Sequence, residues 1–362
     1  MAARLVRLVL AFALWTLFAP DLLAREVRVA FINPGAEQGA DVWALMSRFM
    51  KAAAQQFGFR FEVLYSDRDR VRMVALAREV AQRPLPPDYV VLVNEKQQAP
   101  EMMEFFRGTP VRLVLLHNDL TPEQRQLMGN ERERLPNWIG TITSDDRAVA
   151  AALMGGLYGK AKGEPLILGI GGDKATPVSA EREEGVRNFV AAAGRGRLLQ
   201  VVPGNWARDD AAIKTHHLLQ RYPEANMVWA ANDTMALGAL DAVIEMKMQG
   251  QVEVGGLGAF PQALDSVETG GLAITTGTHL VAGAWSMVMI HDYDQGRDFA
   301  AAGGPHIINN TIIKVADATA AARFRELLEQ PQRVDFHRFS RADNPQLAAY
   351  DFSYEAMLAA AK

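Results

Sequence analysis

The chain has 362 residues, of which 49% are hydrophobic and 22% charged, a balance typical of a water-soluble globular protein with two domains. A net charge of -4 provides no basic surface for a phosphate backbone, which excludes nucleic acid as an expected partner. The lack of cysteine excludes disulfides, thiolate zinc sites, a cysteine nucleophile and a lipid-modified cysteine.

The N-terminus has the pattern of an export signal. Arg4 and Arg7 precede the apolar run 8–18, and the small residue Ala24 stands before a charged pair. The alternative, a membrane anchor, is disfavoured because a run of eleven residues falls short of the ~20 that span a bilayer. We therefore expect residues 1–24 to be a signal peptide, cleaved near Ala24, and the mature protein to be periplasmic.

The first half of the mature chain alternates short apolar runs with segments of helical periodicity. Apolar runs that predict strands are 27–33, 59–66, 89–94 and 111–118, and the segments between them predict helices, the first over 41–57, the others ending near 81 and 108. Strands that are apolar throughout and alternate with helices indicate a parallel sheet covered on both faces.

The same rhythm restarts after residue 137. Strands are predicted at 166–172, 198–203, 226–232 and 252–258, with helices at 146–158, 179–193, 209–221 and 234–248. The tail 331–362 predicts an irregular segment and a short helix. In open α/β sheets ligands bind outside the carboxyl ends of the strands, so we expect function in the loops that follow them.

Motifs for catalysis or cofactors are incomplete. The glycines of 169–172 lack the third glycine of a dinucleotide loop, and in 155–161 an alanine stands where a phosphate loop needs Ser or Thr. His216 and His217 are adjacent, so on a helix they point about 100° apart and cannot share a metal. Neither G-x-S-x-G nor H-E-x-x-H occurs. We expect no cofactor, no catalytic residue and no metal, and a site that binds a polar small molecule.

Three segments carry a family resemblance. Residues 229–240 (WAANDTMALGAL) closely resemble the strand-to-helix junction of the ribose-binding type of periplasmic substrate-binding protein. Residues 179–185 resemble that family's arginine-bearing helix start, and 143–146 its first crossing between lobes. Asn232 and Asp233 could instead serve as ordinary N-caps. Repressors of the lactose-repressor family share this core, but they begin with a helix-turn-helix rather than a signal sequence.

The resemblance implies the fold and the domain boundaries. It implies an α/β fold of two similar doubly wound parallel-sheet lobes, joined by three crossings near residues 141, 277 and 314. The N-terminal lobe is then expected to comprise residues 25–141 and 278–313, and the C-terminal lobe residues 142–277 and 314–362. A ligand would lie in the cleft between the lobes.

The resemblance also implies the binding residues. Trp43 and Trp206 fall on the aromatics that stack on either face of a sugar ring, although core packing is the alternative for each. Arg182 falls on the arginine that grips ring and hydroxyl oxygens, and Asn232 on an amide that bonds hydroxyls. The pair 117–118 ends a strand where the family often has an acid and an arginine. Here it is His117 and Asn118, a departure.

Two glycines depart from the family in the same region. Gly258 stands where sugar binders usually carry an aspartate, and Gly277, just before the candidate ligand residue His279, replaces a common amide. We expect these glycines to leave space for a ligand bulkier than a plain pentose or hexose. The implied ligand class is a sugar-like or polyol-like small molecule.

The stretch 277–299 is similar to the autoinducer-2 receptor branch of the family. Members of that branch present the state of their ligand to a membrane sensor kinase. Two partners therefore stay open for a protein expected to be a monomer: the permease of an ABC transporter, or a sensor kinase.

Overall fold

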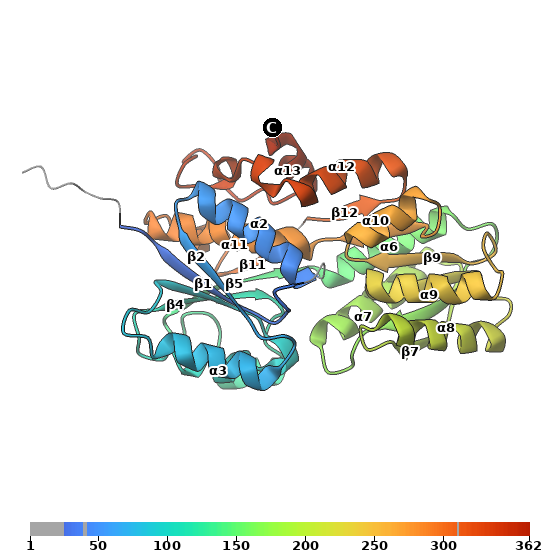
Figure 1. Cartoon of the computed structure of the whole chain (residues 1–362), viewed down its shortest axis with the longest axis horizontal. Helices are drawn as coiled ribbons and strands as arrows, with labels where there is room; N and C mark the ends of the chain where they lie inside the picture. The colour runs from blue at the N-terminus through green and yellow to red at the C-terminus, as the bar shows by residue number, and fades with distance from the viewer. Residues whose placement is uncertain (1–24, 39–41, 310) are drawn as a thin grey trace, which may run out of the picture.

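The structure, a computed structural model, describes residues 25–38, 42–309 and 311–362. The predicted signal peptide, 1–24, lies outside the described residues. Two lobes lie side by side, each built on a six-stranded sheet (Figure 1). The predicted fold class, two similar α/β lobes with parallel-dominated sheets, is confirmed.

The N-terminal lobe has the strand order β11-β5-β4-β3-β1-β2, and every neighbouring pair is parallel. Its strands are β1 (Arg28–Asn33), β2 (Arg60–Tyr65), β3 (Tyr89–Leu92), β4 (Arg112–His117), β5 (Trp138–Ser144) and β11 (His306–Asn309). Its helices are α2 (Val42–Gln56), α3 (Arg70–Ala81), α4 (Ala99–Glu104), α5 (Pro122–Met128) and α11 (His279–Asp294), with the 3-10 helices η2 (Glu95–Gln97) and η3 (Phe299–Ala302).

Both faces of this sheet are buried, which explains why its strands are apolar throughout. Phe31 belongs to the core that includes Met46 of α2, while the next residue, Ile32, belongs to a separate core that includes Met73 of α3. Successive side chains of a strand point to opposite faces, so a sheet covered on both sides needs apolar residues at every position.

The C-terminal lobe has the order β12-β10-β9-β8-β6-β7. Its strands are β6 (Leu166–Gly171), β7 (Arg197–Pro203), β8 (Met227–Ala230), β9 (Glu253–Leu257), β10 (Ile274–Gly277) and β12 (Ile313–Val315). Its helices are α6 (Asp146–Gly159), α7 (Pro177–Ala193), α8 (Arg208–Arg221), α9 (Asp233–Glu245), α10 (Pro261–Glu268) and α12 (Ala318–Glu329). Only the edge strand β12, paired with β10, is antiparallel among the described strands.

The chain passes between the sheets at three places along its described course. The first passage joins β5 to α6 at Asp145, a few residues beyond the expected position near 141. The second joins β10 to α11 at Thr278, and the third joins β11 to β12 and includes residue 310, which is not described. These are the points at which strands of one sheet continue into the other lobe.

The tail differs from the expected division, which assigned residues 314–362 to the C-terminal lobe. After α12 the chain returns to the N-terminal lobe through η4 (Pro331–Arg333), η5 (Phe336–Phe339) and α13 (Tyr354–Ala360). Gln56 of α2 donates to the carbonyl of Val334 at 2.8 Å, and Phe352 stacks on Trp285 of α11 with ring centroids 4.7 Å apart. Figure 1 shows α12 and α13 along the top of the molecule. Burial of aromatic side chains against α11 decides this placement.

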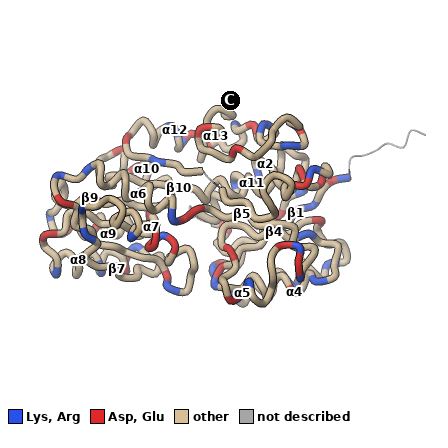
Figure 2. The backbone as a smooth tube through the Cα atoms, turned by 180° about the vertical axis from the view of Figure 1, so that it is seen from behind, with Lys and Arg blue, Asp and Glu red and all other residues tan. Residues whose placement is uncertain are grey.

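The described surface mixes charges of both signs. Figure 2 shows Lys and Arg interspersed with Asp and Glu over both lobes. Such mixing is typical of a solvated surface. Among the described residues, none of the helices combines the length and the apolar composition that crossing a bilayer requires.

Candidate ligand-binding cleft

A cavity of about 280 Å³ lies between the lobes, at the carboxyl ends of strands from both sheets. Its lining includes seven of the eight expected binding residues: Trp43, His117, Asn118, Arg182, Trp206, Asn232 and His279. The eighth, Gly258, is not part of the lining. The volume is slightly below the usual range of about 300–1,000 Å³ for small-molecule pockets.

His117 ends β4 with a positive φ of 69° and turns its ring into the cleft. Burial lowers the pKa of His117 to about 4, so the imidazole is neutral at neutral pH. It packs edge-on against Trp43, with ring centroids 5.6 Å apart, and lies 4.9 Å from the ring of His279. Among the described residues, its Nδ1 has no hydrogen-bond partner.

Asn118 continues this wall of the cleft. Its side-chain nitrogen donates to Oε2 of Glu95 at 3.4 Å, whereas its Oδ1 is buried without a partner in the described part of the chain. A buried polar atom without a partner costs about 1–3 kcal/mol. Two such atoms, on neighbouring residues that line one cavity, indicate a surface that a polar ligand completes.

Arg182, at 4% exposure, is fixed on the opposite wall. Its Nε donates to Oδ1 of Asp146 at 2.7 Å, and one terminal nitrogen donates to the carbonyl of Ala231 at 2.6 Å. The other terminal nitrogen lies 3.2 Å from Nε2 of His279. Burial, together with the Arg182 charge and His117, holds the pKa of His279 well below its usual range. The guanidinium is therefore preorganised, with N–H groups left to face the cleft.

His117, Asp146 and His279 also bring three potential metal-ligand atoms within 4.8 Å of one another. Arg182 already bonds Asp146 and approaches His279. Its positive charge stands where a metal cation would have to bind, and like charges repel strongly in a buried site. The cluster therefore surrounds and positions the Arg182 guanidinium rather than a metal ion.

The two tryptophans line the cavity from different lobes. Trp43, on α2, is 2% exposed and joins the N-lobe core as well as the cleft, so the core-packing alternative also describes it. Trp206 lies in the turn between β7 and α8, beneath the Arg182 guanidinium, whose carbon is 5.8 Å from the ring centroid. A Cβ on Gly172 would lie 2.1 Å from the Trp206 ring, so this glycine makes room for the indole.

Asn232 caps a helix and also lines the cavity. Its side-chain oxygen accepts from the backbone N–H of Met235 at 2.8 Å and caps α9, so the N-cap alternative is confirmed. The residue also lines the cavity. Because Oδ1 serves the cap, the amide nitrogen is the atom left for a ligand.

Asp233 is fully buried and supports the loop after β9. Its carboxylate accepts from the backbone of Phe260 at 2.8 Å and from the Thr275 hydroxyl at 2.7 Å. Burial raises the pKa of Asp233 to about 7. The residue acts on the cleft indirectly, because it fixes the loop that carries Phe260 into the lining.

The expectation that Gly258 and Gly277 leave open space is wrong. A Cβ on Gly258 would lie 2.9 Å from both Oδ2 of Asp233 and the Phe260 ring. One on Gly277 would lie 3.0 Å from the carbonyl oxygen of Gly258. The volume beside these glycines is filled by backbone, a carboxylate and an aromatic ring, so it does not enlarge the cavity.

Sequence reasoning missed several lining residues, among them Arg68, Glu95, Thr176, Thr234 and Phe260. Arg68 follows β2 and Glu95 follows β3, so the rule that ligands bind beyond strand ends could have found both. They pair at 3.4 Å. Burial raises the pKa of Glu95 despite the opposing charge of Arg68.

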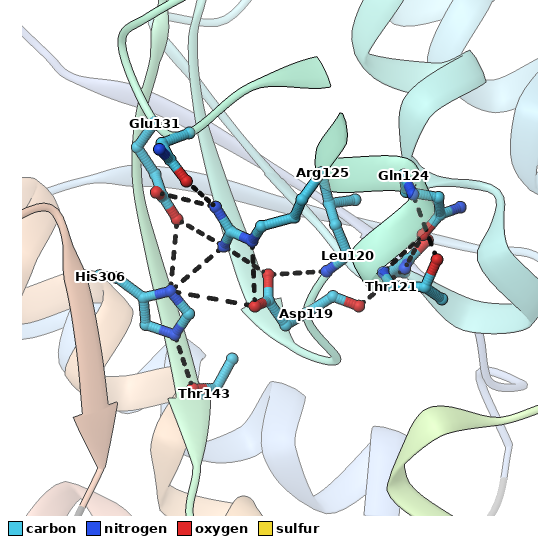
Figure 3. A network of polar contacts seen from close by, with 10 residues as sticks. Asp119, Leu120, Thr121, Gln124, Arg125, Glu131, Thr143 and His306 are labelled. Atoms are coloured by element: carbon cyan, nitrogen blue, oxygen red, sulfur yellow. Dashed lines mark hydrogen bonds and ion pairs between the residues drawn. The ribbon is translucent and has the colours of Figure 1, made fainter. Parts of the chain in front are cut away.

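A wider opening of about 740 Å³ adjoins the cleft on the side of the first and third passages. The polar network of Figure 3 lies along it: Arg125 bonds Asp119 at 2.6 Å and Glu131 at 3.0 Å, and also donates to Nδ1 of His306 at 3.2 Å. Since Nδ1 accepts, Nε2 carries the proton and faces the Thr143 hydroxyl at 3.0 Å. This network joins β11 to β5, the strands that lead into two passages.

With this geometry in view, comparison with known proteins identifies the family. A family model described as a periplasmic binding protein domain matches residues 29–298. The chain belongs to the periplasmic binding protein family. The match covers both sheets up to η3 and therefore every cleft residue named above.

Individual relatives are similar over part of the chain. The D-allose-binding periplasmic protein of Escherichia coli (strain K12) is 31% identical over 149 residues, which are 41% of this chain and 48% of that protein. The ribose import binding protein of Salmonella typhimurium is 30% identical over 206 residues, 51% of this chain and 67% of that protein. A crystal structure of a periplasmic sugar-binding protein from Pseudomonas fluorescens is 32% identical, with a TM-score of 0.79 over 92% of this chain and 99% of that one.

Proposed function

We propose that this periplasmic binding protein captures a sugar-like or polyol-like small molecule in the cleft between its lobes and delivers it to an ABC transporter. In this role the cleft binds its ligand without transforming it. The names of the relatives support the class of ligand, since they bind D-allose and import ribose. The import role of the ribose relative favours a permease as partner over a sensor kinase, and none of the relatives described above supports the autoinducer-2 alternative.

The observation that carries the proposal is the pair of unpartnered polar atoms on two residues that line the cavity. Nδ1 of His117 and Oδ1 of Asn118 are buried without partners among the described residues. A hydroxyl group both donates and accepts, so it can bond either tautomer of the ring and the amide oxygen. A ligand rich in hydroxyls is the simplest chemistry that satisfies both atoms at once.

The charges and rings of the cleft favour a neutral ligand. Arg182 is paired with Asp146, and Arg68 with Glu95, so each charged residue of the lining has an opposite charge beside it. Trp43 and Trp206 offer flat apolar surface from both lobes, suited to the C–H faces of a sugar ring. An anionic or cationic ligand would upset the pairs that hold the cleft together.

The size of the cavity bears on the choice of ligand. About 280 Å³ is available, and other atoms of the protein occupy the space beside the two glycines that suggested extra room. We therefore propose a single monosaccharide or polyol in place of the bulkier ligand expected from Gly258 and Gly277. Contact with both lobes implies that binding favours a closed arrangement of a monomer.

The test begins with the ligand. Native mass spectrometry of protein purified without refolding gives the mass of any molecule that stays bound from the cell. Calorimetry then measures the binding affinities of D-allose, ribose, xylitol and myo-inositol. We expect one bound molecule of monosaccharide or polyol mass and a decrease in the radius of gyration by X-ray scattering at saturation. Failure of every neutral polyhydroxy compound to bind, with a charged ligand retained instead, contradicts the proposal.

Location and partner have separate tests. Residues 1–24 should be absent from protein recovered from the periplasm, with a new N-terminus near Arg25, which N-terminal sequencing measures. Delivery to a transporter predicts loss of ligand uptake when the chromosomal copy is deleted. Unchanged uptake, with altered signalling in its place, would favour the sensor kinase.

A further inference from the structure

Two imidazoles and a carboxylate meet outside the cleft, where the tail packs on the N-terminal lobe. His291 lies in the last turn of α11, His337 lies in η5, and Asp343 follows in the next loop. One ligand atom from each residue lies within 4.8 Å of the others. The return of the tail to this lobe creates the cluster, so its members are 46 and 6 residues apart along the chain.

The ligand atoms of the cluster lie slightly closer together than the ligands of one metal ion do. Nε2 of His291 is 3.2 Å from each oxygen of Asp343, and Nδ1 of His337 is 2.7 Å from Oδ2. Ligands 2.0–2.1 Å from a tetrahedral zinc ion are about 3.4 Å apart. Small movements of these side chains would therefore place all three around one ion.

His337 lies between two hydrogen-bond acceptors. Its Nε2 lies 3.2 Å from the backbone carbonyl of Gln56, which only accepts, so Nε2 carries a proton. In a neutral ring Nδ1 is then a lone pair, yet it points at a carboxylate oxygen 2.7 Å away. Two acceptors at that distance need a proton or a metal ion between them.

The surroundings hold the ligands in place, bury His291 and leave the other two accessible. Phe57 stacks on His291 with ring centroids 4.2 Å apart and meets His337 edge-on at 4.9 Å. The carbonyl of Gln56 orients His337 from behind, as carbonyls commonly do for metal-bound histidines. The side chains of His337 and Asp343 are 47% and 33% exposed, so an ion can reach them from solvent.

We propose that His291, His337 and Asp343 form a binding site for a divalent transition-metal ion, zinc above all, that fastens the C-terminal tail to α11. Two imidazole nitrogens and one carboxylate oxygen suit zinc better than the all-oxygen sites of calcium or magnesium. Water would take the fourth position. The site is separate from the sugar cleft and does not depend on the proposed function.

The test is zinc titration of the untagged, chelator-treated protein by calorimetry at pH 7.5. We expect one zinc ion per chain, and at least tenfold weaker binding in His337→Gln and in Asp343→Asn. His217→Gln is the matched control, because it removes an exposed histidine of α8 and should leave the affinity unchanged.

Cobalt(II) provides a second readout that does not depend on the stability of the variants. Wild type and His217→Gln should develop the visible absorption of a tetrahedral cobalt centre with nitrogen ligands, and the two site variants should not. Zinc should raise the melting temperature of wild type but not that of Asp343→Asn. Absence of binding, or equal affinity in wild type and both site variants, overturns the proposal.

Discussion

The two walls of the cleft differ in whether their buried polar groups have hydrogen-bond partners within the protein. On the C-lobe wall, Arg182 and Asn232 are bonded to other groups of the protein. On the N-lobe wall, His117 and Asn118 each keep one buried polar atom without a partner in the described part of the chain. The first wall is organised by the fold, whereas we propose that a ligand completes the second. A binding cleft can thus combine a rigid anchor with a surface whose stability depends on occupancy.

Removal of the C-lobe anchor should have the largest effect. Arg182→Ala leaves Asp146 as a buried carboxylate without its cation, and the free energy of unfolding should fall by about 3–5 kcal/mol. Urea denaturation measures it. The double variant Arg182→Met with Asp146→Leu removes both charges and should recover most of the loss; equal instability in the double variant would show that the ion pair is not the cause.

Substitutions of the two tryptophans should differ in how much stability they cost relative to ligand affinity. Trp43→Ala opens a cavity in the N-lobe core and should cost about 3–5 kcal/mol of stability along with weaker binding. Trp206→Ala should weaken ligand binding by about 1–3 kcal/mol with a smaller cost to the fold, because its ring is only partly buried in the turn before α8. Denaturation and calorimetry of both variants check this. Equal losses of stability would remove the distinction.

The N-lobe wall should make the free energy of unfolding depend on pH through His117. The pKa of His117 is about 4 in the folded protein and ~6.5 in the unfolded chain. Between these values the unfolded state binds more protons, so this group makes the protein less stable as pH falls from 6.5 to 4, by up to about 3 kcal/mol. Asp233 opposes this trend, because its pKa is raised to about 7.

His117→Phe isolates the histidine from that opposing group. Without ligand, the variant should gain stability relative to wild type as pH falls through this window, because the unpaired ring nitrogen and its protonation are both removed. Its affinity for the ligand should fall about tenfold. If the stability of variant and wild type changes with pH in the same way, His117 is not the group that causes the pH dependence.

The smallest effect concerns the helix cap. Asn232→Ala removes the acceptor for the Met235 N–H and should cost about 1 kcal/mol of stability. Asn232→Asp keeps a capping oxygen but loses the amide N–H, so it should retain stability and still bind ligand more weakly. Thermal melts and calorimetry compare the two. If Asn232→Asp binds as well as wild type, the amide nitrogen does not contact the ligand.

Much of the fold could be predicted from the sequence, because strands buried on both faces must be apolar throughout. The range 89–94, for example, contains β3, and 146–158 nearly coincides with α6. β5 and β10 escaped notice because both interrupt their apolar residues with Thr and Gly, whose burial becomes evident only in the sheet. The family resemblance selected seven of the residues that line the cleft.

The sequence by itself determined the alternation of strands and helices, and with it the edge of each sheet where polar loops gather, because periodicity and strand polarity are local properties. Tertiary structure alone decided which polar atoms those loops leave without partners, since hydrogen bonding depends on neighbours that are distant along the chain. It also decided that Phe260 and a buried carboxylate fill the space beside Gly258. The position of the tail on the N-terminal lobe also depends on distant neighbours, because its aromatic side chains are buried against a helix far away in sequence.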